Sequence, residues 1–416
     1  MTVFKPFRAY RPVTDKAKEV AALPYDVMNE KEARAMVRNL PDSFLRIDRA
    51  EVNLPEGTDP HADAVYETAR ELLEQKIQEG VYVQEAAPVY YIYRLVWKGR
   101  AQTGIVGLLS VEDYENDVIK KHEFTRAEKE KDRIRHVDTT SAHTGPIFIT
   151  YRAQDAIRTI TEQATQQPPE VDITFDDGVT HQIWPLQDEA AIRAIEDAFL
   201  SIPAVYIADG HHRAASAVRV GQHRRDANPG HTGREEYNYF LSVVFPDEDL
   251  LVLDYNRVVE DLNGLDENTF LEKIAERFTL TEREEPTDLH PDAPQQFVMV
   301  LDDKAYTLTP KAGSFDADDP VYSLDASILQ ENLLRPVLGI DDPRTNDRID
   351  FVGGIRGQEG VTRRLKEDMR VGFLLYPTSI AQLMRIADAG EVMPPKSTWF
   401  EPKLRSGLFI HRFESM

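Results

Sequence analysis

Hydrophobic positions recur at helical spacing near residue 70 and in strand-like runs directly afterwards. Between residues 61 and 80 apolar side chains fall three or four positions apart, which predicts an amphipathic helix that Gly80 can end. Residues 89–96 and 103–111 are rich in β-branched and aromatic side chains, and the turn-like residues 97–100 separate them. This pattern predicts a β-hairpin, and we expect both strands to be buried on one face.

A short strand followed at once by a helix is the most informative local pattern. Residues 204–208 form an apolar run, Asp209 and Gly210 interrupt it, and residues 211–220 resume helical spacing before Gly221. The pattern predicts a strand, a tight turn and a helix that Gly221 caps. Upstream, the charged residues 112–135 contain the capping-box spacing Thr125-Arg126-Ala127-Glu128, which places Glu123 in the loop entering a second helix.

A second α/β pattern begins near Leu262. It contains a helix near residues 270–278, a hairpin formed by 297–301 and 305–308, and a strand at 372–376. A final helix follows, capped by Thr378 or Ser379 and ended by Gly390. We therefore predict an α/β protein with mixed sheets and two domains, residues 1–261 and 262–416. The polar, proline-containing stretch 163–169 is a further candidate boundary or surface loop.

Composition excludes several classes of function. Asp and Glu total 72 against 49 for Lys and Arg, so the net charge is -23 and most of the surface repels nucleic acids and anionic membranes. The chain has no cysteine, which excludes disulfides, thiolate catalysis and cysteine-bound zinc. Residues 1–8 lack an apolar signal region, and no apolar run is long enough to span a membrane. We expect a cytoplasmic protein, and the sequence leaves its oligomeric state open, a homodimer included.

The turn at residues 209–213 has the composition of an anion site. A helix N-terminus presents unpaired N–H groups and a partial positive charge, and Gly210 lets an anion approach them. His211 and His212 add ring donors, and Arg213 offers a guanidinium that can bind phosphate in a bidentate manner. Asp209 indicates either a cation, such as Mg²⁺ carried by a nucleotide, or a carboxylate that orients an imidazole. The simpler alternative is that Asp209 only caps a surface helix.

The string Asp209-Gly210-His211-His212-Arg213 resembles the phosphate motif of the ParB/sulfiredoxin-like superfamily. That resemblance implies a ParB/sulfiredoxin-like nucleotide-binding core with insertions, here followed by a C-terminal α/β domain. Sulfiredoxin chemistry itself is excluded, because it needs a cysteine where this chain has His211.

The form of the motif with two histidines looks like the free L-serine kinases, which also carry an upstream His-Glu pair and a C-terminal Pro-Lys-Thr-Thr segment. This chain has His122-Glu123 and Pro395-Lys396-Ser397-Thr398 in the same order. The resemblance implies phosphate transfer from ATP or ADP, with Mg²⁺, to the hydroxyl of free L-serine. Glu123 would be the catalytic base and Lys396, Ser397 and Thr398 would bind phosphate or substrate. His122 and Asp26 are further substrate-binding candidates.

The whole chain also resembles a widespread bacterial family of unknown function, through the segments 24–27, 122–125 and 396–403. Two other functions stay open. One is a nucleotide-binding regulatory protein resembling the ParB CTP switch. The other is a metal-dependent hydrolase with Asp209, His211, His212 and His122 as ligands.

Overall fold

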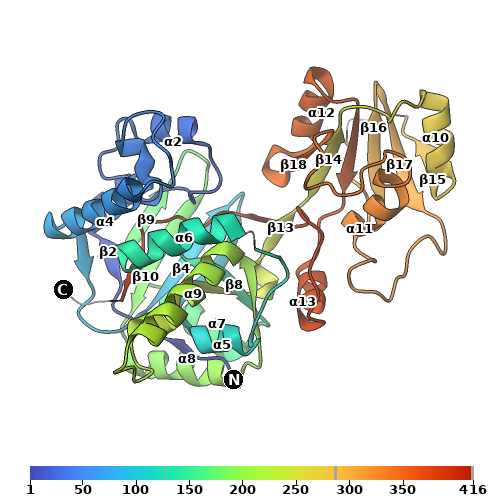
Figure 1. Ribbon diagram of the computed structural model, residues 1–416. Coiled ribbons are helices and arrows are strands. Elements are labelled where there is room, and N and C mark those ends of the chain that lie inside the picture. Colours follow the sequence, from blue (N-terminus) through green and yellow to red (C-terminus); the bar gives the residue numbers. More distant parts are fainter. Residues whose placement is uncertain (126, 285–287, 414–416) are drawn as a thin grey trace. The chain divides into compact units, whose positions relative to one another are not determined.

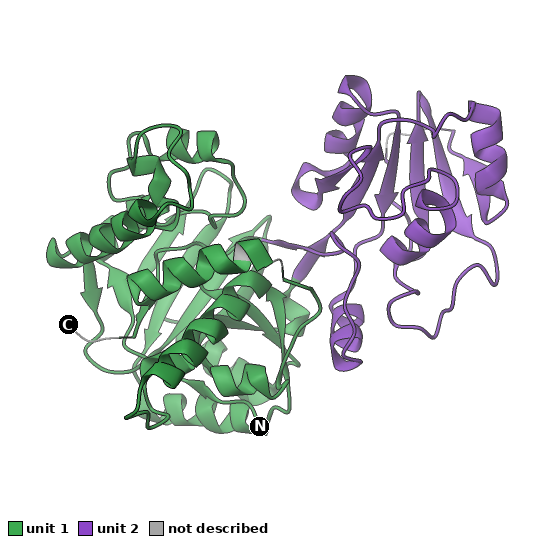
Figure 2. Ribbon diagram, viewed as in Figure 1, with its two compact units in different colours: residues 1–250, 402–416 green, residues 251–401 purple. Residues whose placement is uncertain are grey.

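The computed structural model describes residues 1–125, 127–284 and 288–413, and the chain forms two compact units (Figures 1 and 2). Unit 1 contains residues 1–250 and 402–416, and unit 2 contains residues 251–401. The sequence placed the division after residue 261 and assigned everything beyond it to the second domain. The structure instead returns the C-terminal segment to unit 1.

Unit 1 is built on a nine-stranded mixed sheet with the order β6-β11-β8-β12-β5-β4-β10-β9, and with β1 paired to β5. Its strands are β1 (Phe4–Lys5), β4 (Tyr90–Trp97), β5 (Arg100–Ser110), β6 (Ile119–Lys120), β8 (Ile147–Tyr151), β9 (Val171–Thr174), β10 (Thr180–Leu186), β11 (Val205–Asp209) and β12 (Tyr239–Pro246). The predicted hairpin of residues 89–111 is confirmed, since β4 and β5 pair antiparallel.

Helices α7 (Asp155–Ala164), α8 (Glu189–Ser201) and α9 (His211–Ala227) pack against this sheet in one hydrophobic core. The strands are buried on both faces at β4, and not on one face as expected, because Tyr90, Tyr91 and Tyr93 are all fully buried. Phe409 from the C-terminal segment packs on Tyr91 and Tyr93, with ring centroids 5.2 and 5.6 Å apart. This packing explains why the C-terminal segment belongs to unit 1.

A second core in unit 1 is formed by the N-terminal helices. The predicted helix of residues 61–80 is confirmed as α4, and Gly80 follows it with a left-handed φ of 76°. The remaining elements of unit 1 are β2 (Tyr10–Pro12), α1 (Ala17–Val20), α2 (Glu30–Val37), α3 (Leu45–Asp48), a 3-10 helix (Ala50–Asn53), α4 (Asp63–Gln78), β3 (Tyr82–Gln84), α5 (Val111–Glu115), α6 (Ala127–Thr140), β7 (Ala142–His143) and β21 (His411–Arg412).

Unit 2 contains a six-stranded sheet with the order β15-β17-β16-β19-β14-β18 and a two-stranded ribbon of β13 and β20. The predicted hairpin near residue 300 and the final strand and helix are confirmed, and Ser379 caps that helix. The elements are β13 (Leu251–Leu253), β14 (Tyr255–Val259), α10 (Glu267–Ala275), β15 (Phe278–Glu282), β16 (Phe297–Leu301), β17 (Lys304–Pro310), α11 (Asp325–Leu329), a π-helical turn (Gln330–Leu334), β18 (Ile349–Gly353), α12 (Gly357–Glu367), β19 (Val371–Leu375), α13 (Ile380–Asp388) and β20 (Trp399–Glu401).

Three local predictions need correction or restriction. Helix α9 continues through Gly221 to Ala227, so Gly221 does not cap it. A Cβ at Gly221 would lie 2.6 Å from the carbonyl oxygen of Tyr237, so the glycine allows a close approach inside the helix. Residues 163–169 connect α7 to β9 within unit 1 and are not a domain boundary. The predicted capping box includes Arg126, which lies outside the described residues, and α6 is described from Ala127 onward.

Candidate phosphate-binding site

The predicted strand, turn and helix at residues 204–220 are confirmed as β11, Gly210 and α9. Gly210 has φ 93° and ψ 30°, in the left-handed region that favours glycine. A Cβ there would lie 3.1 Å from the guanidinium of Arg213, which folds back over the turn. The N-cap position makes no side-chain hydrogen bond. The N-cap residue therefore provides no side-chain acceptor for the first amides of α9.

The parallel pairing of β6 with β11 brings the second predicted motif to the same place. Val205 pairs with Ile119 and Tyr206 with Lys120, so both strands end at one edge of the sheet. His122 and His211 then pack edge to face, with ring centroids 4.4 Å apart. Nδ1 of His211 lies 3.6 Å from Oε2 of Glu123. Two motifs almost ninety residues apart thus meet in one site.

The hydrogen bond of His211 indicates its protonation state. The backbone N–H of His122 donates to Nε2 of His211 at 3.4 Å, so Nε2 is unprotonated and the ring proton lies on Nδ1, facing Glu123. Burial, reinforced by the neighbouring ring of His122, holds the pKa of His211 well below its usual range. Burial also lowers the pKa of His122 to about 4. Both rings are therefore neutral at pH 7.

Asp209 forms an ion pair with Lys403, which arrives from the C-terminal segment. Nζ of Lys403 lies 3.2 Å from Oδ2 of Asp209, and the backbone N–H of Gly210 donates to Oδ1 at 2.9 Å. Burial alone would raise the pKa of Asp209, but the charges of Lys403 and Arg213 outweigh it and lower that pKa. Asp209 is therefore a carboxylate at neutral pH.

The occupied oxygens of Asp209 do not fit the predicted magnesium contact. Mg²⁺ needs oxygen ligands in octahedral geometry, and Lys403 stands where the ion would approach Oδ2. Within the described ranges, no three His, Asp or Glu side chains are grouped so that they could hold a metal ion. The geometry thus gives no support to a hydrolase that uses Asp209, His122, His211 and His212 as ligands.

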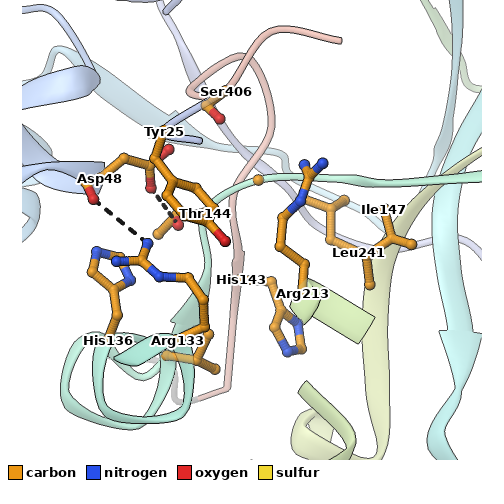
Figure 3. Close-up of a pocket in the computed structure, with 12 residues that line it drawn as sticks. Tyr25, Asp48, Arg133, His136, His143, Thr144, Ile147, Arg213, Leu241 and Ser406 are labelled. Carbon is orange, nitrogen blue, oxygen red and sulfur yellow. Dashed lines mark hydrogen bonds between the residues drawn. The ribbon is translucent and has the colours of Figure 1, made fainter. Parts of the chain in front are cut away.

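Arg213 connects the turn to a small cavity of about 30 Å³ in unit 1 (Figure 3). Its Nη1 donates to the carbonyl oxygen of Pro146 at 2.7 Å. Its Nε is buried and has no hydrogen-bond partner among the described residues. Because a buried donor without an acceptor is costly, this nitrogen is a candidate contact for a bound anion. His212 is half-buried beside it.

The structure brings together most, but not all, of the predicted site residues. Asp26 is exposed and lines a separate, larger cavity of unit 1. Lys396, Ser397 and Thr398 belong to unit 2, where the hydroxyl of Ser397 donates to the carbonyl of Pro394 at 2.7 Å. Lys403 was not predicted as a site residue, although it ends the segment 396–403 that carried the family resemblance. The residues that meet at the turn are His122, Glu123, Asp209, Gly210, His211, His212, Arg213 and Lys403.

None of the helices in the described part of the chain has the length and hydropathy to cross a membrane.

Comparison with known proteins gives a family and several distant similarities of fold. A family model described as "Protein of unknown function (DUF1015)" matches residues 4–327, which confirms the resemblance to a family of unknown function. No curated protein matches the chain.

Similar solved structures include "Free serine kinase in complex with AMP", with 13% identity, 70% of this chain and 86% of that chain covered, and a TM-score of 0.37. A conserved hypothetical protein from Pyrococcus furiosus has 14% identity, coverage of 71% and 91%, and a TM-score of 0.36. SbnI with C-terminal truncation from Staphylococcus aureus has 12% identity, coverage of 72% and 84%, and a TM-score of 0.33. At such values the roles of the site residues depend on the geometry alone.

Proposed function

We propose that this protein, which belongs to the DUF1015 family, binds a nucleotide by its phosphates at the N-terminus of α9 and transfers a phosphoryl group to the hydroxyl of a small molecule. One observation carries the proposal. An exposed carboxylate, Glu123, lies 3.6 Å from the buried His211 at an uncapped helix N-terminus. A base and an anion cradle are the two parts that such a transfer needs.

The anion cradle rests on charge and on hydrogen bonds. The N-terminal amides of α9 and its dipole favour a phosphate at Gly210. Arg213 adds a guanidinium with a buried, unsatisfied Nε–H, and Lys403 adds an ammonium group. In a chain with a net charge of -23, Arg213 and the Lys403 of the Asp209 pair bring two cationic donors beside this helix N-terminus, where a phosphate can bind them.

Glu123 is the proposed base. As the acceptor hydroxyl oxygen bonds to the terminal phosphorus, the bond from phosphorus to the bridging oxygen breaks and the hydroxyl proton passes to the Glu123 carboxylate. The Nδ1–H of His211 faces that carboxylate and orients it. Arg213 and Lys403 stabilise the charge on the phosphoryl oxygens. Asp209 holds Lys403 in place and does not contact the nucleotide.

The donor is ATP or ADP, and free L-serine is the first acceptor to test, because the motifs resemble those of free L-serine kinases. Mg²⁺ enters the proposal only as the ion that accompanies the nucleotide, and Asp209 is not its ligand. The assignment of the core to the ParB/sulfiredoxin-like superfamily stays a prediction, as do the contacts assigned to Lys396, Ser397 and Thr398.

The test measures binding and transfer separately. The full chain is titrated with ATP or ADP in a calorimeter, then incubated with nucleotide, Mg²⁺ and L-serine while phosphorus NMR detects O-phosphoserine. We expect Glu123→Gln to bind nucleotide normally and to lose about a hundredfold or more of the transfer rate. Replacing both His212 and Arg213 by Ala should abolish nucleotide binding. Unchanged nucleotide affinity in that double variant would overturn the site.

The regulatory alternative predicts a different result in the same assays. A nucleotide-binding switch would bind nucleotide through Arg213 but transfer phosphate to none of a panel of amino acids and polyols. Glu123→Gln would then have no measurable consequence for a reaction. A matched control is Glu71→Gln, an exposed glutamate of α4 whose replacement should change neither binding nor transfer.

A further inference from the structure

A cavity of about 390 Å³ opens among the N-terminal elements of unit 1. It is lined by the loop around Tyr25, by α3 and the 3-10 helix after it, and by α4 and α6. We call it the large cavity, and the space at Arg213 the small cavity. Its volume is within the range of pockets that bind small molecules, which is about 300–1,000 Å³.

The large cavity adjoins the small cavity that Arg213 lines. The large and small cavities share Tyr25, Asp48, Arg133 and His136 as lining residues, and Arg213 lines the far side of the small one. Figure 3 shows Tyr25 and Arg133 on one side of the small cavity and Arg213 on the other. The small cavity has room for only one or two water-sized groups. The two cavities meet at the four shared residues, and this boundary is the side of the large cavity nearest Arg213.

The side chains that line both cavities are held in place by buried polar contacts. Arg133 is 8% exposed, pairs with Asp132 at 2.8 Å and lies 4.1 Å from the ring centroid of Tyr25. Asp132 also accepts the hydroxyl of Tyr66 at 2.7 Å, and Asp48 accepts that of Thr144 at 2.8 Å. Such a satisfied network fixes the shape of the cavity before any ligand binds.

The lining of the large cavity is acidic. It contains five carboxylates, Asp26, Asp48, Glu51, Glu128 and Asp132, against two guanidinium groups, Arg49 and Arg133. Each arginine is already neutralised, because Arg49 pairs with Glu51 at 2.7 Å and Arg133 with Asp132. Burial and the charge of Arg133 lower the pKa of His136, so this histidine adds no positive charge at pH 7. Asp26 and Glu128 form no ion pair with another described residue and leave the wall with an excess of negative charge.

We propose that the large cavity binds the phosphate acceptor, and that this acceptor is a hydroxylated amine with no net negative charge. Its ammonium group lies beside Asp26 and Glu128, and its hydroxyl lies at the boundary with the small cavity that Arg213 lines. Hydroxy acids are excluded by the same carboxylates. The inference rests on the proposed phosphoryl transfer. It defines the chemical class of the acceptor, of which L-serine is one member.

Three compounds of similar size isolate the effect of charge, namely serinol with an ammonium group, glycerol with none, and glycerate with a carboxylate. Each is titrated into the full chain without nucleotide, at pH 7 and low salt, with ligand-observed NMR. We expect serinol to bind about fivefold more tightly than glycerol and glycerate to bind most weakly. Binding of glycerate as tight as that of serinol would overturn the inference.

The variant Asp26→Asn with Glu128→Gln sharpens the test. We expect the Kd of serinol to rise to that of glycerol, with the Kd of glycerol unchanged, while Glu71→Gln on α4 changes neither. An unchanged serinol Kd in the double variant would overturn the inference, as would serinol that binds but is not phosphorylated when serine is. Loss of nucleotide binding, measured separately, would instead remove the proposed function, so the two failures are distinguishable.

Discussion

Helices α9 and α13 both follow a buried strand, α9 after Gly210 and α13 after residues 376–379, and their N-termini differ in how they are capped. At α13 the Ser379 hydroxyl accepts the N–H of Gln382, and the Gln382 side chain accepts the N–H of Ser379. At α9 the corresponding position is Gly210, which has no side chain and makes no cap. The N-terminus of α13 is capped by its own side chains, whereas the N-cap residue of α9 provides no side-chain cap.

A glycine at the N-cap costs only roughly a few tenths of a kcal/mol relative to Ser, so the fold tolerates Gly210 at the start of α9. At α9 the turn is accompanied by Arg213, by Lys403 beside Asp209, and by Glu123 beside His211. This difference indicates that the two strand-to-helix turns have different functions. The α13 turn caps its own helix, and we propose that the α9 turn binds phosphate instead.

Among the variants that test this comparison, Gly210→Ala has the largest expected effect. A non-glycine residue at φ 93° is strained by about 1–2 kcal/mol, and the new Cβ lies 3.1 Å from Arg213. Relief of that contact displaces the guanidinium from the turn. We expect nucleotide affinity to fall by more than about tenfold, as measured by calorimetry.

Gly390→Ala is the matched control for that variant. Gly390 follows α13 with φ 70°, and a Cβ there meets nothing within 4 Å. This variant carries a similar backbone strain without touching the site, so it should lose stability and keep its nucleotide affinity. Equal loss of binding in both glycine variants would mean that α9 is not the nucleotide site.

The second-largest effect on nucleotide affinity is expected from Arg213→Lys, which keeps the charge but removes the planar guanidinium. Lysine cannot reproduce both the bond to the carbonyl of Pro146 and the unsatisfied Nε–H. We expect nucleotide Kd to rise about tenfold with little change in thermal stability. A Kd equal to that of the wild type would show that Arg213 acts only as a general positive charge.

A smaller effect, on stability, is expected from Lys403→Met. The charge of Lys403 helps to lower the pKa of Asp209 in the folded state, so this pair stabilises the protein above the ordinary aspartate pKa of about 4 and less as the pH falls through the folded value. The Asp209 side chain is 34% exposed, and solvent screening therefore limits the loss to about 1 kcal/mol at pH 7.

Urea unfolding at pH 7 and at several values below pH 4 checks this, since the difference between wild type and Lys403→Met should narrow as the pH falls. Lys304→Met is the control, because its pair with Glu282 is 3.7 Å long and both side chains are exposed. A constant difference at all pH values would indicate that Lys403 acts through packing of its stem.

The open turn could be predicted from sequence because its signals are local. The apolar run before Asp209, the glycine and the polar residues after it lie within ten positions. The partners of the turn depend on distant pairing. Lys403 reaches Asp209 across 194 residues, and Glu123 arrives only through β6, a strand of two residues that no periodicity reveals.

The same distinction explains the domain boundaries. Hydrophobic periodicity predicted the strands and helices near the boundary, but it contains no information on which unit the last residues join. The packing of Phe409 on Tyr91 and Tyr93 decides that, and it is a contact between residues more than three hundred positions apart. Gly221 shows the reverse error, because a local rule for helix ends gave way to the close approach of Tyr237.

The smallest effect on the site is expected from Ser379→Ala, which opens the α13 N-terminus as the α9 N-terminus is open. Loss of the capping box should cost about 1 kcal/mol of stability, measured by urea unfolding of the full chain. Nucleotide and acceptor affinities should stay unchanged, because an open helix N-terminus binds phosphate only when cations and a base accompany it. If Ser379→Ala created a second nucleotide site, the amides alone would suffice, and the roles given to Arg213 and Lys403 would have to be withdrawn.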